Sequence, residues 1–362
     1  MSQVRVLSSP PKKDHQSMAL FFTLSFLQII LLYDIIFVII ILGVLMKNTV
    51  LTVITAIIVL TLAVCGIVFT PSVSDVQFKT IKILIIVCAC SAAYCFIVGE
   101  ISRNNSQMDK LWSILPIAYT WIVAGMGGMS VRLVVIAVIV TLWGIRLTFN
   151  FARKGAYSIK FWTGEEDYRW VILRQKGLLK NKFVWALFDL FFISIYQNAL
   201  VLAICLPAVA VMESGALFGA LDIVFAILAL SFLALETVSD EIQWKFQSTK
   251  YKMLNEGKKL EELPAPYDKG FNTVGVWAFS RHPNYLSEQA IWICIYMFTI
   301  AAGVVNNVIF NWSIVGCMLL VLLFLGSSGF GESVSSEKYE GYKEYQKQAS
   351  KYFIIPFKRY KG

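Results

Sequence analysis

The chain has 362 residues, of which 57% are hydrophobic and only 15% are charged, and its mean hydropathy is +0.67. This composition excludes an ordinary soluble domain. The formal net charge of +9 comes without an aromatic–basic or zinc pattern, so we expect no nucleic-acid partner.

Apolar segments of about 20 residues, the length that crosses a bilayer, recur along the chain. We expect spans near residues 19–46, 50–70, 81–99, 111–127, 131–149, 183–211, 215–237, 289–305 and 309–326. The predicted fold class is all-α: a polytopic integral membrane bundle of about 8–10 transmembrane helices. Residues 1–18 are polar and lack the early apolar region of a cleaved signal peptide, which predicts an N-terminal tail. Residues 19–99 are expected to form an N-terminal transmembrane extension, and residues 100–362 the main membrane domain.

Lysine and arginine are concentrated in three segments, which hold 23 of the 32 in the chain: residues 146–182, 241–282 and 331–362. Two predicted spans separate each segment from the next, so all three can lie on one face of the membrane. Positive residues near span ends favour the cytosolic face. Counting back through five spans places the N-terminus on the opposite side, although Arg5, Lys12 and Lys13 argue mildly against this.

The seven cysteines all lie inside predicted spans without the paired spacing of a metal or redox site, so we interpret them as small buried residues. With two histidines in the chain, no histidine-rich metal centre is expected. The sequence also contains no P-loop, no dinucleotide-binding glycine motif after a strand and no nucleophile elbow.

Asp109 stands just before the segment 111–127, and Trp112 stands near the start of that segment. Asp109 is placed either to cap a helix N-terminus or to serve as a polar group in a pocket. At the end of the segment 131–149 and just beyond it, one helix face carries Arg146, Asn150, Arg153 and Lys154, because 3.6 residues make one turn. These side chains either reach the headgroups or form a ladder that holds an anion such as phosphate.

Glu236, Asp240 and Gln243 follow one another at i, i+4 and i+7, where the segment 215–237 ends. A run of hydrogen-bond acceptors there suits ribose or amide groups, and a solvated helix exit explains it almost as well.

Residues 280–288 read Ser-Arg-His-Pro-Asn-Tyr-Leu-Ser-Glu and stand directly before a hydrophobic helix expected from Ala290 to Ala302. Polar and charged groups are costly near the hydrocarbon region and usually face a partner, a cavity or a ligand. A binding site is therefore predicted at this motif.

The C-terminal region carries an apolar and phenolic stripe at helical spacing, with lysines opposite: Tyr339, Tyr342, Tyr345, Ala349 and Tyr352. Such a helix lies at the interface or packs on its neighbours, or else it closes over a cofactor.

The motif at residues 280–288, preceded by Gly275-Val-Trp277, resembles the signature of the steroid 5-alpha-reductase C-terminal-like family, and in particular its poorly characterised polytopic membrane subgroup. The accessory motifs occur in the same order: Asp109 with Trp112, Trp143-Gly-x-Arg146, Asp240-x-x-Gln243 and the tyrosine-rich tail. The similarity covers about residues 100–358 and leaves the N-terminal extension unmatched.

This resemblance implies a helical bundle that holds NADPH in a pocket open to the cytosol and reduces a C=C bond in a steroid or other lipid that enters from the bilayer. An endoplasmic reticulum or other internal membrane is implied as its location. The cofactor-binding residues that it implies are Arg146, Asp240, Gln243, Arg281, His282, Asn284, Tyr285, Glu288, Tyr339 and Tyr342.

Three positions depart from the family pattern. Leu286-Ser287 stands where the family has an aromatic residue or leucine and then glycine, and Glu236 stands where asparagine is common. The catalytic Glu/Tyr pair of the reductases has no clean counterpart, since its tyrosine position aligns with Trp143. Tyr119 and Asp109 are the candidates for catalytic residues in its place.

Two further function classes stay open. Isoprenylcysteine carboxyl methyltransferases, which bind S-adenosylmethionine, share an Arg-His-Pro-x-Tyr core but generally lack the Asp-x-x-Gln and Trp-Gly-x-Arg elements. A catalytically silent lipid-binding membrane protein is the other alternative, and the retained cofactor motif argues against it.

Overall fold

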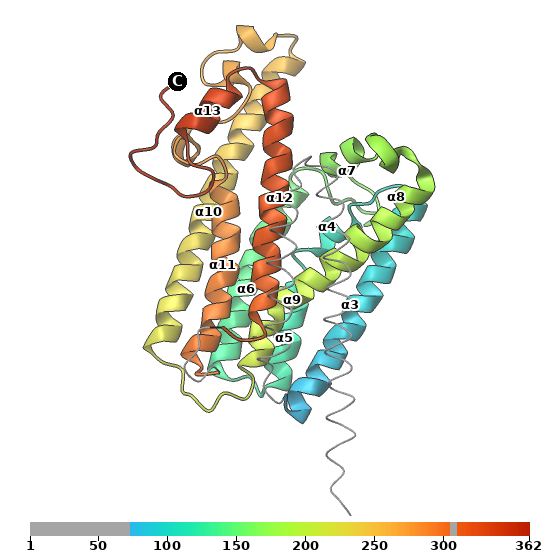
Figure 1. Cartoon of the computed structure of the whole chain (residues 1–362), viewed down its shortest axis with the longest axis vertical. Helices are drawn as coiled ribbons and strands as arrows, with labels where there is room; N and C mark the ends of the chain where they lie inside the picture. Colours follow the sequence, from blue (N-terminus) through green and yellow to red (C-terminus); the bar gives the residue numbers. More distant parts are fainter. Residues whose placement is uncertain (1–72, 305–309) are drawn as a thin grey trace, which may run out of the picture. The chain divides into compact units, whose positions relative to one another are not determined.

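The described part of the chain is built from helices that run side by side, as Figure 1 shows. The computed structural model describes residues 73–304 and 310–362. Within these two ranges there is no β-strand, and Ser280 and Ser350 form an isolated parallel bridge. The predicted tail 1–18 and the predicted spans 19–46 and 50–70 lie outside the described residues.

The α-helices have these bounds: α3 Asp75–Ser102, α4 Gln107–Leu111, α5 Leu115–Met126, α6 Val131–Ala152, α7 Tyr168–Leu173, α8 Lys182–Phe188, α9 Gln197–Ala210, α10 Ala220–Asn255, α11 Pro283–Ala301, α12 Ile314–Lys338 and α13 Tyr342–Gln348. A π-helical stretch, Asp189–Tyr196, joins α8 to α9 without a break. Short 3₁₀ turns lie in the connections at Gly177–Lys180, Leu260–Glu262, Tyr267–Lys269 and Gly275–Ala278.

Five of the described helices are long and apolar enough to cross a membrane: α3, α6, the continuous helix Lys182–Ala210, α10 and α12. This confirms the predicted all-α fold of a membrane protein. The predicted span 111–127 is interrupted, because α4 ends at Leu111 and α5 starts at Leu115. With 12 residues, α5 extends only about 18 Å, against about 30 Å for a hydrocarbon core.

Helix α11 begins at Pro283, several residues earlier than the sequence suggests. Proline suits the first position of a helix because its missing N–H group would have no partner there. Asn284 and Glu288 therefore lie in the first two turns of α11. Four residues apart, they share one face of the helix.

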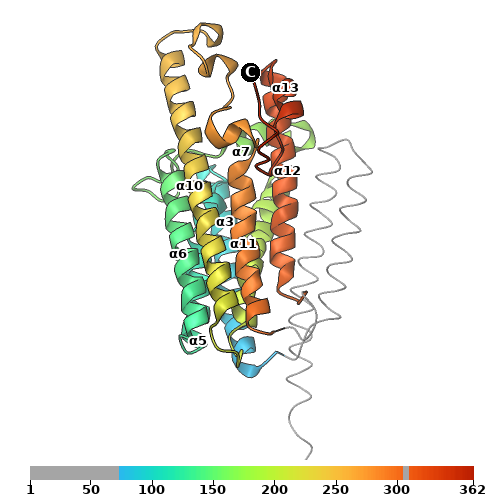
Figure 2. The same cartoon turned by 90° about the vertical axis from the view of Figure 1, so that its left-hand side faces the viewer.

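Helices α6, α10 and α11 lie next to one another (Figure 2), and α10 packs most extensively against α11. Gly144 fixes the place of α6, because a Cβ atom there would lie only 2.5 Å from the carbonyl oxygen of Ser113. The absence of a side chain lets α6 approach the turn between α4 and α5. This packing positions Trp143 and Arg146, which flank the glycine.

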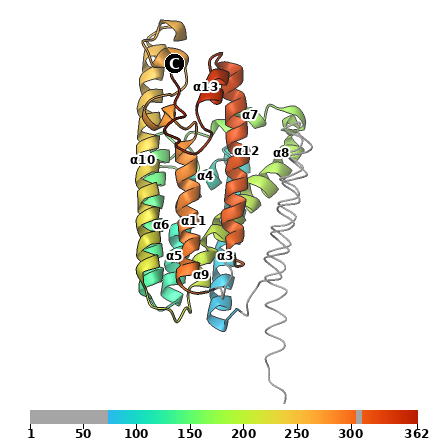
Figure 3. The ribbon, with the colours of Figure 1, turned by 60° about the vertical axis from the view of Figure 1, so that its left-hand side comes forward.

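From α6 onward, α6, the helix Lys182–Ala210, α10, α11 and α12 run in alternating directions, which Figure 3 makes easy to follow. The connections that contain the three basic segments therefore lie at one end of the bundle, the end that carries the C-terminus (Figure 1). At the opposite end, the guanidinium of Arg132 donates to both carboxylate oxygens of Asp222, at 2.7 and 2.9 Å. It also donates to the carbonyl oxygens of Ala216 and Leu217, which ties α6 to the start of α10.

Candidate functional site

Three helices bring one arginine and three acidic side chains together, and we name this group, Arg146, Glu236, Asp240 and Glu288, the central cluster. Nη2 of Arg146 on α6 lies 2.5 Å from Oε1 of Glu236 on α10. Its Nη1 lies 2.6 Å from Oδ2 of Asp240, one turn further along α10. Oε2 of Glu288 on α11 lies 3.9 Å from Nη2 of Arg146.

Two amide side chains hold Asp240 in place within the central cluster. Nδ2 of Asn150 donates to Oδ2 of Asp240 at 2.9 Å, and Nδ2 of Asn284 donates to Oδ1 at 3.0 Å. With the Arg146 contact, both oxygens of Asp240 are satisfied. Arg146 and Asn150, which the sequence places on one helix face, thus both donate to Asp240, a carboxylate of the chain itself.

Two indoles hold Glu288. Nε1 of Trp143 donates to Oε2 at 2.7 Å, and Nε1 of Trp292 donates to Oε1 at 3.2 Å. The two rings meet edge to face with their centroids 5.0 Å apart. Both tryptophans are fully buried, so the carboxyl group of Glu288 is enclosed by apolar rings and has its orientation fixed.

Four buried polar atoms of this region have no hydrogen-bond partner among the described residues: Oε2 of Glu236, Oδ1 of Asn284, and Nε and Nη2 of Arg146. Of these, Nη2 of Arg146 is ion-paired with Glu236. A buried polar atom without a partner costs about 1–3 kcal/mol, so such atoms usually indicate a bound water or ligand. The position of the Glu236 and Asn284 oxygens beside Arg146 and Asp240 marks the place where a ligand would contact the protein.

Arg281 and His282 point away from the central cluster and fasten the C-terminal region. Nε of Arg281 lies 2.7 Å from Oε1 of Glu332 on α12, and Nε2 of His282 lies 3.0 Å from the same oxygen. Nη1 of Arg281 also donates to the carbonyl oxygens of Gln346 and Ala349, at 2.8 and 2.6 Å. These two predicted cofactor ligands are therefore engaged by the protein.

Tyr285 packs against His282 and against Phe324 of α12. Its ring stacks on His282 with centroids 5.1 Å apart, and it meets Phe324 edge to face at 4.6 Å. Gln243, one turn beyond Asp240, accepts a hydrogen bond from Nδ2 of Asn272 at 2.9 Å.

Tyr339 and Tyr342 belong to an aromatic group around Phe271, together with Tyr345 and Tyr360. The rings of Phe271 and Tyr342 meet edge to face with centroids 5.1 Å apart. Tyr345 donates to the carbonyl oxygen of Trp277 at 2.5 Å. The tyrosine stripe thus packs on neighbouring segments, which is one of the two interpretations of the sequence.

Asp109 lies inside the first turn of α4 and does not cap it. Its carboxylate accepts a hydrogen bond from Nε1 of Trp170 at 2.7 Å and lies 3.5 Å from Nη2 of Arg169. Burial and the nearby Asp167 raise the pKa of Asp109, whereas Arg169 acts in the opposite direction. No contact described in the structure joins Asp109 to the central cluster.

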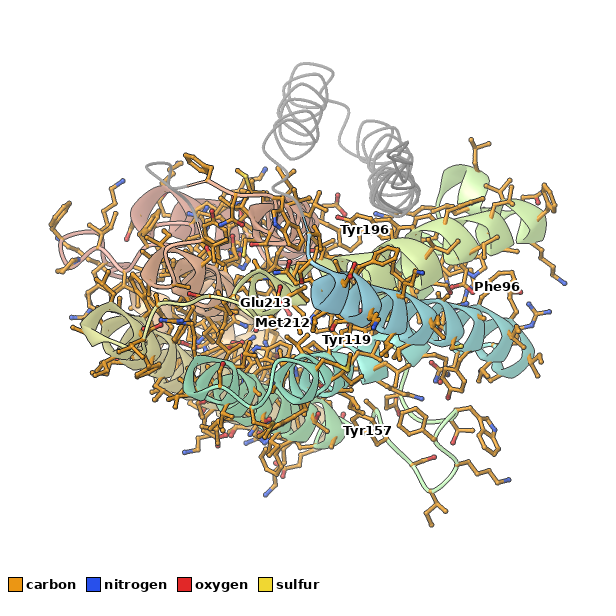
Figure 4. All side chains as sticks on the ribbon, turned by 90° about the horizontal axis from the view of Figure 1, so that it is seen from below. Phe96, Tyr119, Tyr157, Tyr196, Met212 and Glu213 are labelled. Atoms are coloured by element: carbon orange, nitrogen blue, oxygen red, sulfur yellow. The ribbon has the colours of Figure 1, made fainter. Side chains whose placement is uncertain are left out.

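Tyr119 lies on α5 and is completely buried. Figure 4 shows it between α3 and α5, seen from the end opposite the C-terminus. Its hydroxyl group is buried and has no hydrogen-bond partner among the described residues. The two catalytic candidates are thus placed apart from the residues that meet at α11.

The structure brings together Arg146, Asp240, Asn284 and Glu288 of the predicted cofactor residues. Three residues that contact these side chains are absent from the predicted cofactor-binding residues: Glu236, Asn150 and Trp143. A helical signal existed for two of them, because Glu236 precedes Asp240 by four residues and Asn150 follows Arg146 by four. Trp143 offered no such signal, since its contact with Glu288 joins residues 145 positions apart.

The described residues contain no group of three or more His, Cys, Asp or Glu side chains with an arrangement suited to a metal ion. The three carboxyl groups of the central cluster surround a guanidinium, which occupies the position a cation would take.

A family described as "protein of unknown function (DUF1295)" matches residues 95–349, which include every member of the central cluster. The chain belongs to this family. An uncharacterised protein of Schizosaccharomyces pombe is 35% identical to it over 278 residues, which cover 71% of this chain and 77% of the relative. No solved structure matches the chain.

The DUF1295 match begins within α3 and ends at Ala349, directly after α13. It therefore spans all described helices except the first part of α3. Arg281 and both of its carbonyl partners, Gln346 and Ala349, also fall inside the matched range.

Proposed function

We propose that this DUF1295 protein is a membrane-embedded reductase that uses NADPH to reduce a C=C bond in a steroid or other lipid. The observation that carries the proposal is the unpartnered, buried Oδ1 of Asn284 beside Asp240 and Arg146. The similarity of residues 280–288 to the steroid 5-alpha-reductase signature supports it. The long apolar helices would admit a substrate from the bilayer.

The residues of the central cluster fit the nicotinamide end of this cofactor. A carboxamide offers N–H donors, and Oδ1 of Asn284 and Oε2 of Glu236 are acceptors without a partner among the described residues. A phosphate is negatively charged, as ionised carboxyl groups are, so three carboxyl groups around one guanidinium do not fit it. The phosphates would need other cations.

Lys154 is a candidate for a phosphate contact. It follows α6 and makes no ion pair within the described ranges, whereas its neighbour Arg153 is paired with Glu241 at 2.5 Å. Burial lowers the pKa of Lys154, although Asp240 and Asp167 act in the opposite direction. An anion beside this ammonium group would restore the charge balance.

When bound, NADPH supplies a hydride. The chain would hold and orient the cofactor: Asn284 would accept a hydrogen bond from the carboxamide, and Asp240 fixes the side chain of Asn284. The indoles of Trp143 and Trp292 close one side of the central cluster and exclude water from it.

One observation favours a second candidate, an S-adenosylmethionine-dependent methyltransferase of the isoprenylcysteine carboxyl type. The central cluster has more acidic than basic groups, and S-adenosylmethionine carries a sulfonium and an ammonium cation. The same ligand test separates the two.

We further propose that the basic end of the bundle faces the cytosol in an internal membrane such as the endoplasmic reticulum. The position of the three basic segments at that end supports this orientation.

Thermal unfolding of the purified chain in mild detergent, with NADPH, NADH or S-adenosylmethionine added, tests the function. A ligand at 100 times its dissociation constant adds about 2.7 kcal/mol of stability. We expect NADPH to stabilise the protein. Stabilisation by S-adenosylmethionine alone would favour the methyltransferase, and no response to any of the three would favour a lipid-binding protein without enzymatic activity.

A pair of asparagine variants makes this test specific to the site. Asn284→Ala removes the unpartnered acceptor and should abolish the response to NADPH. Asn181→Ala removes the cap of α8, whose Oδ1 accepts from the backbone N–H groups of Phe183 and Val184. Loss of a cap costs about 1 kcal/mol, so this control should be similarly destabilised and still respond.

A further inference from the structure

The charges of the central cluster do not balance. One guanidinium faces three carboxyl groups, which gives a formal charge of −2 if all of them are ionised. Glu236 is only 4% exposed and Glu288 is also 4% exposed. Unpaired charges are strongly disfavoured in such surroundings, and a carboxyl group there keeps its proton instead.

The contacts show where the missing proton lies. Asp240 accepts three hydrogen bonds from Arg146, Asn150 and Asn284, as an ionised carboxylate does. The carboxyl groups of Glu236 and Glu288, in contrast, lie beside one and the same nitrogen, Nη2 of Arg146, at 2.5 and 3.9 Å. Two ionised carboxylates next to one guanidinium nitrogen and away from water repel each other, so one of the two keeps its proton.

The charged groups that face this pair come from every helix that packs there. Arg146 approaches the pair from α6, and Asp240 lies beside it one turn along α10. Further out, Arg153 is paired with Glu241. Arg146 is therefore the only cation with an ion pair to the two glutamates among the described residues.

We infer that Glu236 and Glu288 share one proton and that this pair is the acid that protonates the lipid substrate. The inference rests on the proposed reductase function. In the reaction, one carbon of the C=C bond receives a hydride from NADPH, which becomes NADP⁺. The other carbon takes the shared proton as its O–H bond breaks, and the electron pair of that bond stays on the carboxylate. Water then returns a proton to the pair.

Infrared spectroscopy of the chain without any ligand tests the shared proton, because a protonated carboxylic acid has a C=O stretch distinct from that of a carboxylate. We expect the difference spectrum between wild type and Glu236→Gln at pH 7 to show the loss of one such band. Glu288→Gln should remove the same band, since either change leaves one glutamate paired with Arg146. Glu241→Gln, the matched change on α10 outside the pair, should retain it.

The same band in wild type, Glu236→Gln and Glu288→Gln would overturn the inference. Should Glu236→Gln fail to fold, Glu288→Gln decides the question alone. Neither result depends on whether NADPH binds, so failure of the shared proton and failure of the proposed function are distinguishable.

Calorimetry then links the proton to the reaction. NADP⁺ has a cationic ring that NADPH lacks, and a cation beside the pair favours release of its proton. Titrations in two buffers of different ionisation enthalpy should show up to one more proton released with NADP⁺ than with NADPH. Glu236→Gln should abolish this difference and Glu241→Gln should preserve it. A difference that persists in Glu236→Gln would overturn the role of Glu236, and binding of neither nucleotide would overturn the role of the pair in reduction.

Discussion

At the scale of single residues, Arg146 is the only cation among the described residues that forms ion pairs within the central cluster. It contacts Glu236 and Asp240 at 2.5 and 2.6 Å, and its side chain is 11% exposed. Arg146→Met would leave three carboxyl groups without a cation. Breaking a buried ion pair by removing one partner costs about 3–5 kcal/mol, so we expect a large fall in the midpoint of thermal unfolding.

A double variant checks this explanation. Asp240→Asn removes one of the carboxylates that lose their partner, so Arg146→Met combined with Asp240→Asn should be more stable than Arg146→Met alone. Additive effects of the two substitutions would contradict the electrostatic account.

His282 predicts a pH dependence. Burial lowers its pKa below the usual 6.5, while Glu332 raises it and Lys351 and Arg281 lower it further. The neutral imidazole is therefore favoured in the folded state. The stability that this contributes is present above the unfolded pKa of about 6.5 and is lost as pH falls toward the lower folded pKa.

Unfolding midpoints at pH 7 and pH 5 measure this effect. His282→Gln cannot gain a proton, so the variant should lose less stability between these pH values than wild type does. Equal losses in both proteins would place the responsible group elsewhere.

The sequence identified most residues of the candidate site but not their partners. Asn284 and Glu288 stand in one motif, and Asp240 lies in a second, so each could be recognised locally. The ion pair of Arg146 with Asp240 joins residues 94 positions apart, and helix periodicity contains no information on which helices become neighbours. Arg281 and His282 belong to the same motif and still point to Glu332, which no local pattern indicated.

At the scale of helices, close packing of α12 on α9 depends on Gly316. A Cβ atom there would collide with the backbone of Ala203 and Ile204. Gly316→Ala should destabilise the protein by about 1–3 kcal/mol, because overpacking forces backbone shifts. Thermal unfolding in detergent measures the change.

Gly331 provides the control on the same helix. No atom lies within 4 Å of a Cβ atom at this position. Gly331→Ala should be neutral or stabilising by up to about 1 kcal/mol, since alanine favours a helix more than glycine does. Similar losses in both variants would show that helix propensity, and not the α9 contact, determines the result.

The boundaries of the helices were less predictable than their existence. The start of α11 at Pro283 follows from proline at the first helical turn, a signal that the apolar segment 289–305 obscured. The π-helical stretch Asp189–Tyr196 leaves no mark in hydrophobic periodicity. Its buried Asp189 accepts from Asn105, 84 positions earlier, at 2.8 Å, a contact that only the folded chain reveals.

At the scale of the whole molecule, the grouping of basic segments at one end leads to a test of orientation. An acceptor Asn-Gly-Ser inserted after Gly215, in the connection between α9 and α10, should be glycosylated when the chain is made in cells. The same insertion after Gly257, beyond α10, should not be. The reverse pattern would contradict the proposed cytosolic position of the basic end.

The existing Asn104-Asn105-Ser106 sequence is a useful reference for that experiment. Asn104 is buried, and its Nδ2 donates to the carbonyl oxygen of Gly164 at 3.0 Å. We expect no glycosylation there on either orientation, because the amide is already engaged inside the protein.

The contact of Arg281 with the C-terminal region can form only after that region has been synthesised. Its Nη1 donates to the carbonyl oxygen of Ala349, 68 residues further on. At roughly 5–20 residues per second, synthesis needs several more seconds to deliver that partner after Arg281 has been joined. During that interval α11 is already made while Arg281 lacks its partner, so the central cluster can assemble before the motif is fastened to the C-terminal region.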